Sequence, residues 1–404
     1  MSNINHIIKK TILCILVLFL FCVLRAHAAV LPPDTDNAAL LYYQAFLLRP
    51  EIDDDTFLHF NSVLGGAQPN EKVREYLNMM ETRESLRIAE AATKILDCSW
   101  GIILRSRNGS SLNTVVFQAR QLAYLLEVDA RTLAADGDHR AALERCLSIR
   151  RLAQHHADEG LVGYLASMPL HGRSFGCIQH VLSSMPAEAN VLTWLQAQLS
   201  AVQGAPASPG RAMEITLDDD LEFYRMYPEA LGEWRESVYE RIEDDSARQE
   251  IMNLTDEALL ERASELGHSF LSSINRIIGS DMTYRQRRAE LQGLKAEWPD
   301  HGDNDPNTIL SECVRINLDD VVKYHDIYVR RLANLNAVRA AIEIYLIEEE
   351  TGQLPGTLPP YLPKDPFGDE KFGYEKTEEG FVLRCTEKEI GEDTLWDYEF
   401  RVVQ

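Results

Sequence analysis

Residues 115–156 have the sequence "VVFQARQLAYLLEVDARTLAADGDHRAALERCLSIRRLAQHH". Apolar and small residues recur there at steps of three or four on both sides of Gly137 and Asp138, a pattern typical of two amphipathic helices. Gly137 can end the first helix in a left-handed conformation, and Asp138 can cap the start of the second. The stretch therefore predicts two helices that fold back on each other as a hairpin.

The hairpin resembles the helical hairpin of tetratricopeptide repeat proteins. The resemblance rests on "GDHRAALERCLSI" (137–149), with its Gly-Asp turn, and on the small residues Ala142 and Ala130 where the two helices must touch. Gln154 stands where the family usually has a helix-ending proline, and no second copy follows at the family's period of about 34 residues. The resemblance implies a helical-hairpin or irregular solenoid layer, without a regular repeat array.

Helical patterns continue on both sides of the hairpin. Asp34 or Asp36 can cap a helix in "NAALLYYQAFLL", and apolar steps of three or four predict a single further helix over residues 70–96. After the hairpin we expect a helix that ends near Pro186, then several acidic helices. A long helix of roughly 40 residues should follow and stop at Gly352.

Beyond Gly352 the sequence alternates apolar and polar residues, as β-strands do. "KFGYEKTEEGFVLRC" (371–385) predicts a hairpin with its turn at 377–380, and "LWDYEFRVV" (395–403) predicts a third strand. We therefore expect a mainly α fold with an irregular helical-hairpin, solenoid-like body. A small C-terminal α+β module should complete it, in which a long helix packs on a three-stranded antiparallel sheet.

The N-terminus has the order of a secretory signal. Lys9 and Lys10 precede an apolar run of 14 residues, and "RAHA" ends at Ala28, where we expect cleavage. The run is short for a membrane-spanning helix, and an uncleaved signal that anchors the protein is the alternative. No later stretch approaches the apolar length of a span. The mature protein is expected to be secreted or periplasmic, without a membrane span.

These patterns divide the chain into five segments. The linker has the composition "QGAPASPG", and the last segment begins within the long helix that leads into the strands. The segments are a signal (1–28), a helical domain with the hairpin (29–202), the linker (203–210), an acidic helical region (211–330) and a helix plus β module (331–404).

The formal net charge is −23, and removal of the signal, with three positive charges and no negative one, changes it to −26. Such a charge repels nucleic acid, so no nucleic-acid partner is expected. Five cysteines follow the signal, which is too few for a fold held by disulfides. An oxidising compartment allows one or two bridges, and the pairing stays open among Cys98, Cys146, Cys177, Cys313 and Cys385.

One motif matches the site of a serine hydrolase. Residues 172–176, "GRSFG", fit the pattern G-x-S-x-G, in which a turn between a strand and a helix exposes the nucleophile. Here a helical stripe of apolar residues precedes the motif, so we interpret Gly163, Gly172 and Gly176 as positions where helices pack closely. Ser174 is kept as the one candidate nucleophile.

A second motif concerns calcium. Asp303, Asp305 and Asn307 have the first three ligand spacings of a calcium-binding loop. Thr308 replaces the glycine that such a loop requires, and Val314 stands where its closing glutamate belongs. An ordinary polar loop is the preferred interpretation and calcium the alternative. No other cofactor is predicted.

Further candidate metal ligands lie in two places. Glu389, Glu392 and Asp393 form an acidic group near the C-terminus that could bind a cation. His155 and His156 end the second helix of the hairpin, where the helix dipole favours positively charged side chains. Adjacent residues do not share a helix face, so a metal site on this histidine pair is not expected.

The C-terminal segment resembles the soluble domain of the major pseudopilins of type II secretion. The resemblance covers about 60 of the 404 residues and rests on a helix, then "GQLP", then "YLPKDPFG" and strands. It implies that Asp365 and Pro366 fix a turn and that Gly368 permits the reversal into strands. Phe367 and Tyr374 would cover the helix. The matching positions are Tyr345, Gly352, Pro355, Leu362, Pro363, Asp365, Pro366, Phe367, Gly368 and Tyr374.

The chain departs from pseudopilins at both ends. A signal and a helical body come before the module, and "TEKEIGEDTLWDYEF" replaces the calcium-binding loop of that family. The whole layout resembles a group of exported helical proteins of planctomycete-like bacteria, a group without an assigned activity. This resemblance implies an architecture and a location, and no reaction.

Three functions are consistent with these patterns. The leading hypothesis is an exported, non-catalytic scaffold or protein-interaction protein of the cell envelope, because helical hairpins present binding surfaces and no convincing catalytic motif occurs. The alternative is an exported hydrolase or ligand-binding enzyme with a carboxylate-lined cleft. A third hypothesis is a calcium-binding envelope protein. A protein partner in the envelope is expected, and the oligomeric state is left open.

Overall fold

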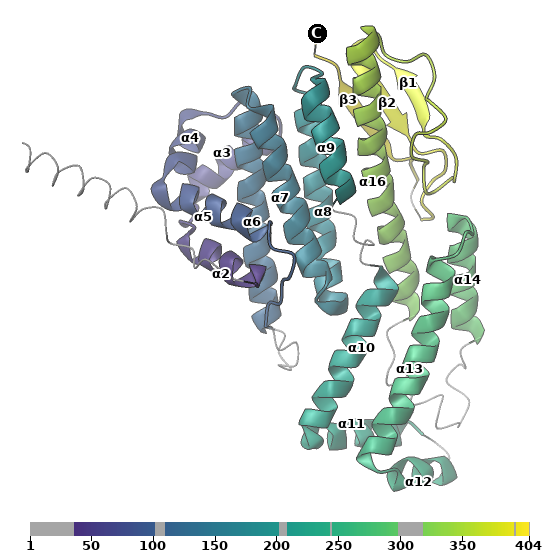
Figure 1. Ribbon diagram of the computed structural model, residues 1–404. Helices are drawn as coiled ribbons and strands as arrows, with labels where there is room; N and C mark the ends of the chain where they lie inside the picture. The colour runs from purple at the N-terminus through teal and green to yellow at the C-terminus, as the bar shows by residue number, and fades with distance from the viewer. Residues whose placement is uncertain are drawn as a thin grey trace, which may run out of the picture.

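The computed structural model describes residues 36–101, 110–201, 208–242, 245–297, 318–391 and 393–403. These residues are predominantly helical and end in a three-stranded antiparallel sheet (Figure 1), which confirms the expected mainly α fold with a small β module. The expected signal segment lies outside the described residues. Within them, no helix has the length and hydropathy of a membrane span.

The helical hairpin is formed by α6 (Ser110–Ala135) and α7 (His139–Ala157). Gly137 has a φ of 84°, which glycine adopts without strain, and the side chain of Asp138 accepts a hydrogen bond from Ala141 N at 3.2 Å. Ala130 and Ala142 are fully buried. The turn at Gly137 and the cap at Asp138 are therefore confirmed, whereas the cap expected from Asp34 or Asp36 is wrong, because Asn37 caps the first described helix.

The next helix, α8 (Gly160–Leu182), packs along α7 and is joined to it by a disulfide between Cys146 and Cys177. The two Cα atoms are 5.8 Å apart, and both side chains are buried. Cys98 and Cys385 are free in the structure. The tertiary contact between α7 and α8 thus selects a pairing that the sequence left open.

Four short helices cover one side of the hairpin (Figure 1): α2 (Ala38–Leu48), α3 (Asp54–Leu64), α4 (Glu71–Asn78) and α5 (Met80–Ala92). The single helix expected over residues 70–96 is wrong, because the chain turns at Met79, which has φ −55° and ψ 139°. Both halves bury an apolar stripe, so the periodicity continues across the break. The turn lets α5 pack on α2, where Ser85 Oγ donates to Ala45 O at 2.8 Å.

On the other side of α8 lie α9 (Ala189–Ala201) and the long helix α16 (Leu318–Thr351). Gly352, with φ 70°, follows the last turn of α16 as predicted. Strands β1 (Gly373–Lys376), β2 (Gly380–Arg384) and β3 (Asp397–Arg401) pair in the order β1-β2-β3. The three predicted strands are confirmed.

The register of the sheet explains its attachment to α16. Phe381 pairs with Phe400 across β2 and β3, and both side chains are buried on the face toward α16. Their rings surround Tyr345 of α16, whose hydroxyl donates to Arg401 O at 2.6 Å. The largest core also includes buried residues of α6, α7, α8 and α9, so the β module shares one core with the expected first domain.

The turn expected at Asp365 and Pro366 is built around a fully buried carboxylate. Asp365 accepts hydrogen bonds from Phe367 N at 3.0 Å and from Thr386 N and Oγ1 at 2.7 and 2.9 Å. A Cβ on Gly368 would lie 2.1 Å from Thr386 Oγ1. The ring of Phe367 meets Tyr284 edge-on at 5.1 Å, and that of Tyr374 contacts Phe381.

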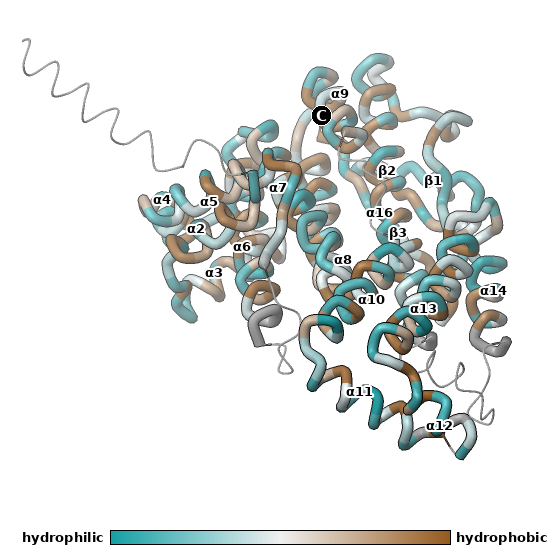
Figure 2. The backbone as a smooth tube through the Cα atoms, turned by 60° about the horizontal axis from the view of Figure 1, so that its bottom comes forward, coloured by the Kyte–Doolittle hydropathy of each residue, from teal (hydrophilic) through white to brown (hydrophobic). Residues whose placement is uncertain are grey.

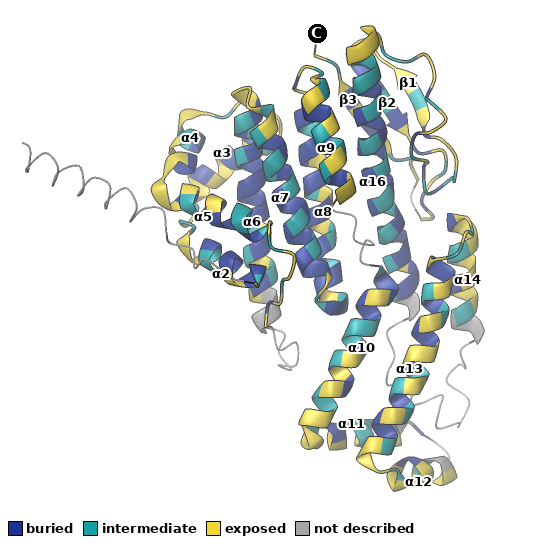
Figure 3. Ribbon diagram, in the orientation of Figure 1, coloured by how far each residue is buried: buried dark blue, intermediate teal, exposed yellow. Residues whose placement is uncertain are grey.

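The remaining helices form an arm with its own core: α10 (Pro209–Met226), α11 (Pro228–Arg241), α12 (Asp245–Asn253), α13 (Asp256–Ile278) and α14 (Tyr284–Glu297). α13 packs along α10, and apolar and polar positions alternate along it (Figure 2). α11 and α12 lie across the far end of this pair and are more exposed than the central helices (Figure 3). The expected linker over 203–210 is too long, since Ser208 already caps α10.

Candidate functional site

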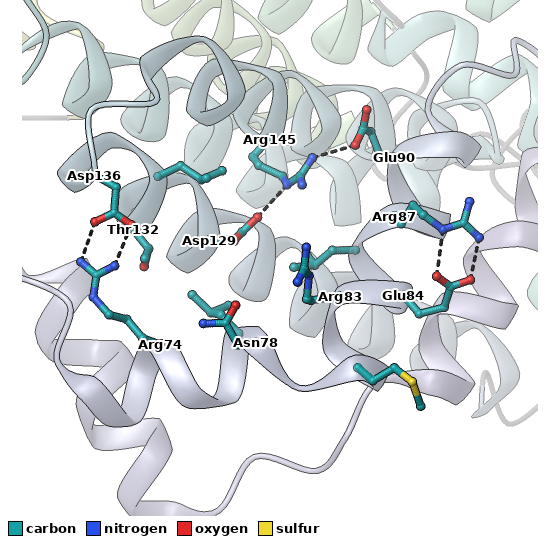
Figure 4. A pocket seen from close by; sticks show the side chains of 14 residues that line it. Arg74, Asn78, Arg83, Glu84, Arg87, Glu90, Asp129, Thr132, Asp136 and Arg145 are labelled. Atoms are coloured by element: carbon teal, nitrogen blue, oxygen red, sulfur yellow. Dashed lines mark hydrogen bonds and ion pairs between the residues drawn. The ribbon is translucent and has the colours of Figure 1, made fainter. Parts of the chain in front are cut away.

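A groove of about 740 Å³ opens between α4 and α5 on one side and α6 and α7 on the other (Figure 4). Its walls carry four arginines and four carboxylates that come from all four helices or the turn after α6. The apolar side chains of Leu77, Leu86 and Leu133 line it between them. The charged residues are Arg74, Arg83, Glu84, Arg87, Glu90, Asp129, Asp136 and Arg145.

Two ion pairs stand at opposite ends of the groove (Figure 4). Arg74 of α4 donates two hydrogen bonds to Asp136, at 2.6 and 2.7 Å, and so joins α4 to the end of α6. Arg87 donates two to Glu84 of the same helix, at 2.6 and 2.8 Å. The arginine hydrogen bonds hold the pKa values of Asp136 and Glu84 below their usual range, so both carboxylates are ionised at neutral pH.

A third arginine connects three helices at the floor of the groove. Arg145 of α7 donates to Asp129 of α6 at 2.7 Å and to Glu90 of α5 at 2.8 Å. Burial raises the pKa of Asp129, and Arg145 offsets only part of that rise. Burial by itself would also raise the pKa of Glu90. The positive charges and hydrogen bonds of Lys94 and Arg145 outweigh this effect, so the pKa of Glu90 is lowered. Arg145 therefore holds α5, α6 and α7 together electrostatically.

Arg83 differs from the other arginines of the groove. Its exposed side chain stands in the middle of the groove (Figure 4) and makes no hydrogen bond or ion pair with the described residues. It lies close enough to Asp129 to lower the pKa of that carboxyl, without touching it. Met80, at the rim, is 76 % exposed. The groove thus offers one available guanidinium between paired charges and apolar side chains.

The candidate nucleophile lies away from this groove. Ser174 is fully buried inside α8, where its hydroxyl donates to Cys146 O at 2.7 Å, and the motif around it is helical throughout. Close helix packing at Gly172 and Gly176 is a wrong interpretation, because a Cβ at either position would meet nothing within 4 Å. The expected close packing is confirmed at Gly163, whose Cβ would lie 2.3 Å from His156 O.

The candidate calcium ligands are not brought together in the described part of the chain. Asp303, Asp305 and Asn307 lie outside the described residues, as does Glu392. Glu389 is buried and accepts hydrogen bonds from Arg330 at 2.7 and 3.0 Å and from Trp396 Nε1 at 3.0 Å. Asp393 is exposed. Within the described ranges, no group of three or more histidine, cysteine or acidic side chains is arranged to hold a metal.

His155 and His156 end α7, but the positive charge expected there is wrong. Both side chains are buried, and burial lowers the pKa of each to about 4. The hydroxyl of Tyr42 is 3.0 Å from His155 Nδ1, and the ring of Trp100 stacks on His156 with 4.5 Å between centroids. The cost of burying a charge exceeds what the helix dipole returns, so both histidines are neutral.

Sequence reasoning missed the groove because its charges converge from separate helices. Arg74 and Asp136 are 62 positions apart, and Arg145 and Glu90 are 55 apart. The one local signal is the cluster of Arg74, Arg83 and Arg87 in a strongly acidic chain. No family model, curated protein or solved structure matches the chain.

Proposed function

We propose that this protein is an exported, non-catalytic interaction protein of the cell envelope that holds a segment of a protein partner in the charged groove. The observation that carries the proposal is Arg83, an exposed guanidinium inside a groove whose other charged side chains are already paired with one another. An unpaired guanidinium can orient a bound ligand. The paired charges keep the walls of the groove ordered when no ligand is bound.

The chemistry of the groove suits an acidic peptide. A guanidinium binds a carboxylate through parallel hydrogen bonds, which gives a defined orientation as well as attraction. The chain as a whole carries a net charge of −23 and repels acidic partners over most of its surface. Leu77, Leu86 and Met80 add apolar contacts beside Arg83. The partner segment we propose therefore pairs a carboxylate with an apolar side chain.

Two features support export. The first is the signal-like order of charged, apolar and small residues at the N-terminus. The second is the buried disulfide between Cys146 and Cys177, since such bridges form and persist in oxidising compartments. We propose a location in the cell envelope on the basis of these two features.

The alternative of a hydrolase or ligand-binding enzyme draws on the same groove, because four carboxylates line it. Acid and base catalysis needs carboxyl groups that are free to exchange protons with a substrate. Asp129 and Glu90 are bound to Arg145, Asp136 to Arg74 and Glu84 to Arg87. These pairs favour binding over catalysis as the function of the groove.

The test compares two charge reversals of exposed arginines in the full chain. Arg83→Glu places a carboxylate in the groove, whereas Arg225→Glu makes the same change on α10, outside it. Tagged wild-type protein and both variants are crosslinked in envelope fractions of the native host, and recovered partners are quantified by mass spectrometry. We expect a partner that wild type and Arg225→Glu recover equally and that Arg83→Glu recovers at least tenfold less.

The same proteins are then titrated with labelled peptides from the recovered partner. Replacement of the acidic residues in such a peptide by their amides should weaken its binding to wild type and leave binding to Arg83→Glu unchanged. Recovery of identical partners by both variants, or of none by the wild type, would refute the proposal. Unchanged melting temperatures of the two variants would show that the substitutions leave the fold intact.

A further inference from the structure

Four polar side chains are buried where α8 lies between α7 and α16. Arg150 comes from α7, Tyr164 and His171 from α8, and Arg331 from α16. Their exposed fractions are 3 %, 0 %, 2 % and 8 %. Arg331 acts electrostatically on each of the other three, so the group forms one cluster.

The polar atoms of this cluster lack partners. Nε and Nη1 of Arg150, Nη1 of Arg331, both ring nitrogens of His171 and the hydroxyl of Tyr164 are buried without a hydrogen bond to the described residues. A buried donor without an acceptor destabilises the folded state, and a charged one does so more strongly. So many unpaired donors in one place are exceptional in a folded protein.

The charges of the cluster do not balance either. Burial lowers the pKa of Arg150 to about 9, and the charge of Arg331 adds to that effect. The acidic residue that acts on Arg331 is Asp158, an exposed side chain just after the end of α7. Two buried guanidiniums therefore repel each other, and among the described residues Asp158, at the surface, is the carboxylate that offsets their charge.

Two other arginines that pack against α7 or α8 have carboxylate partners. Arg145 is bound by Asp129 and Glu90, and Arg173 by Glu127. Arg145 stands only five positions before Arg150 on the same helix, facing the groove, whereas Arg150 lies over the ring of Phe175 of α8. Within this one helix, Arg145 therefore has two counter-charges, whereas Arg150 has none among the described residues.

We propose that the cluster is an internal binding site for a small oxyanion, the phosphate or carboxylate group of a small molecule. Guanidinium forks match the oxygen atoms of such groups, and Tyr164 and His171 can donate further hydrogen bonds to them. One oxyanion would satisfy donors of three helices and neutralise two charges. The site is separate from the groove and does not depend on its proposed function.

The test uses thermal unfolding of the full chain at pH 7 and constant ionic strength, with chloride replaced stepwise by phosphate in one series and by acetate in another. A ligand that binds only the folded state raises the melting temperature in a saturable way, by about 3 °C at a hundred times its Kd. Ion chromatography of anions released from dialysed, denatured protein detects a ligand that stays bound through purification. The series that responds, or the released anion, tells phosphate from carboxylate.

Two variants distinguish a site from a structural role. Arg331→Met removes one unpaired guanidinium at similar length, so in chloride it should melt at the wild-type temperature or above it, and it should lose the anion response. Arg145→Met removes an arginine that has its partners, so it should melt lower and keep the response. The proposal would be overturned if the wild type showed no saturable shift and released no anion. A shift that persists in Arg331→Met would overturn it as well.

Discussion

The carboxylate of Asp365 accepts three hydrogen bonds in the interior, two of them from the backbone nitrogens of Phe367 and Thr386. These bonds hold the turn that leads from α16 into the sheet, and Gly368 leaves the room that Thr386 Oγ1 needs. Asp365, for which the resemblance to pseudopilins implies a turn, therefore has a specific structural role. Its function is to organise backbone, since every contact it makes is internal.

Asp365→Ala should lower the free energy of unfolding by about 2–4 kcal/mol, because it leaves buried donors without an acceptor. Asp365→Asn keeps one acceptor oxygen and should cost less. The matched control is Asp393→Ala, an exposed side chain in the same module, with an expected change within about 0.5 kcal/mol. Urea unfolding measures all three. A loss below about 1 kcal/mol for Asp365→Ala would show that the turn is held by other contacts.

At the scale of elements, α8 organises the molecule, since it packs on α6, α7, α10 and α16. Its glycines have different tasks. Gly163 lets α8 approach the end of α7, where a Cβ would lie 2.3 Å from His156 O, whereas the surroundings of Gly172 are open. The disulfide between Cys146 and Cys177 then joins the same two helices further along.

This difference gives a matched pair of substitutions on one helix. Gly163→Ala should destabilise the protein by about 1–3 kcal/mol, because a backbone atom of α7 must move to admit the methyl group. Gly172→Ala should stabilise it by about 0.5–1 kcal/mol, since alanine loses less conformational entropy in an exposed helical position. Thermal and urea unfolding measure both changes. Equal effects of the two substitutions would contradict the close approach of α7 and α8.

At the scale of the whole molecule, the largest core joins the helical hairpin, α8, α9, α16 and the β module. Several histidines are buried in the interior, and burial lowers the pKa to about 4 for His155 and His156 and to about 3 for His325. In the unfolded chain a histidine has a pKa near 6.5. The unfolded state therefore binds more protons below this pH, and stability is lost as pH falls from about 6.5 toward 4.

His156→Phe should make the pH dependence shallower. Between pH 7 and pH 5, protonation of the unfolded wild-type chain at this histidine lowers the free energy of unfolding by about 2 kcal/mol. Phenylalanine binds no proton, so the variant does not lose this stability. Partial loss of hydration raises the pKa values of Asp158 and Glu159, which opposes this trend, so the measured quantity is the difference between variant and wild type. Exposed His268→Gln is the control. Parallel stability curves for His156→Phe and wild type would refute the prediction.

The candidate site could be predicted from the sequence only in part. The residue types were visible, since arginines gather at positions 74–87 in an acidic chain, but their partners Asp129 and Asp136 belong to another helix. Within the cluster of Arg150, His171 and Arg331, the two arginines are 181 positions apart in the sequence. No local pattern marks such convergence, because it depends on how three helices are rotated against one another.

The amino-acid sequence alone determined the elements whose signals are local: the turn at Gly137 and Asp138, the end of the long helix at Gly352, and the strands that follow it. Backbone conformation there depends on neighbouring residues, so composition and period suffice. Only the tertiary structure decided the break at Met79, the pairing of Cys146 with Cys177 and the neutral state of His156. These depend on which surfaces meet, because packing and burial override local preference wherever helices distant in the sequence come into contact.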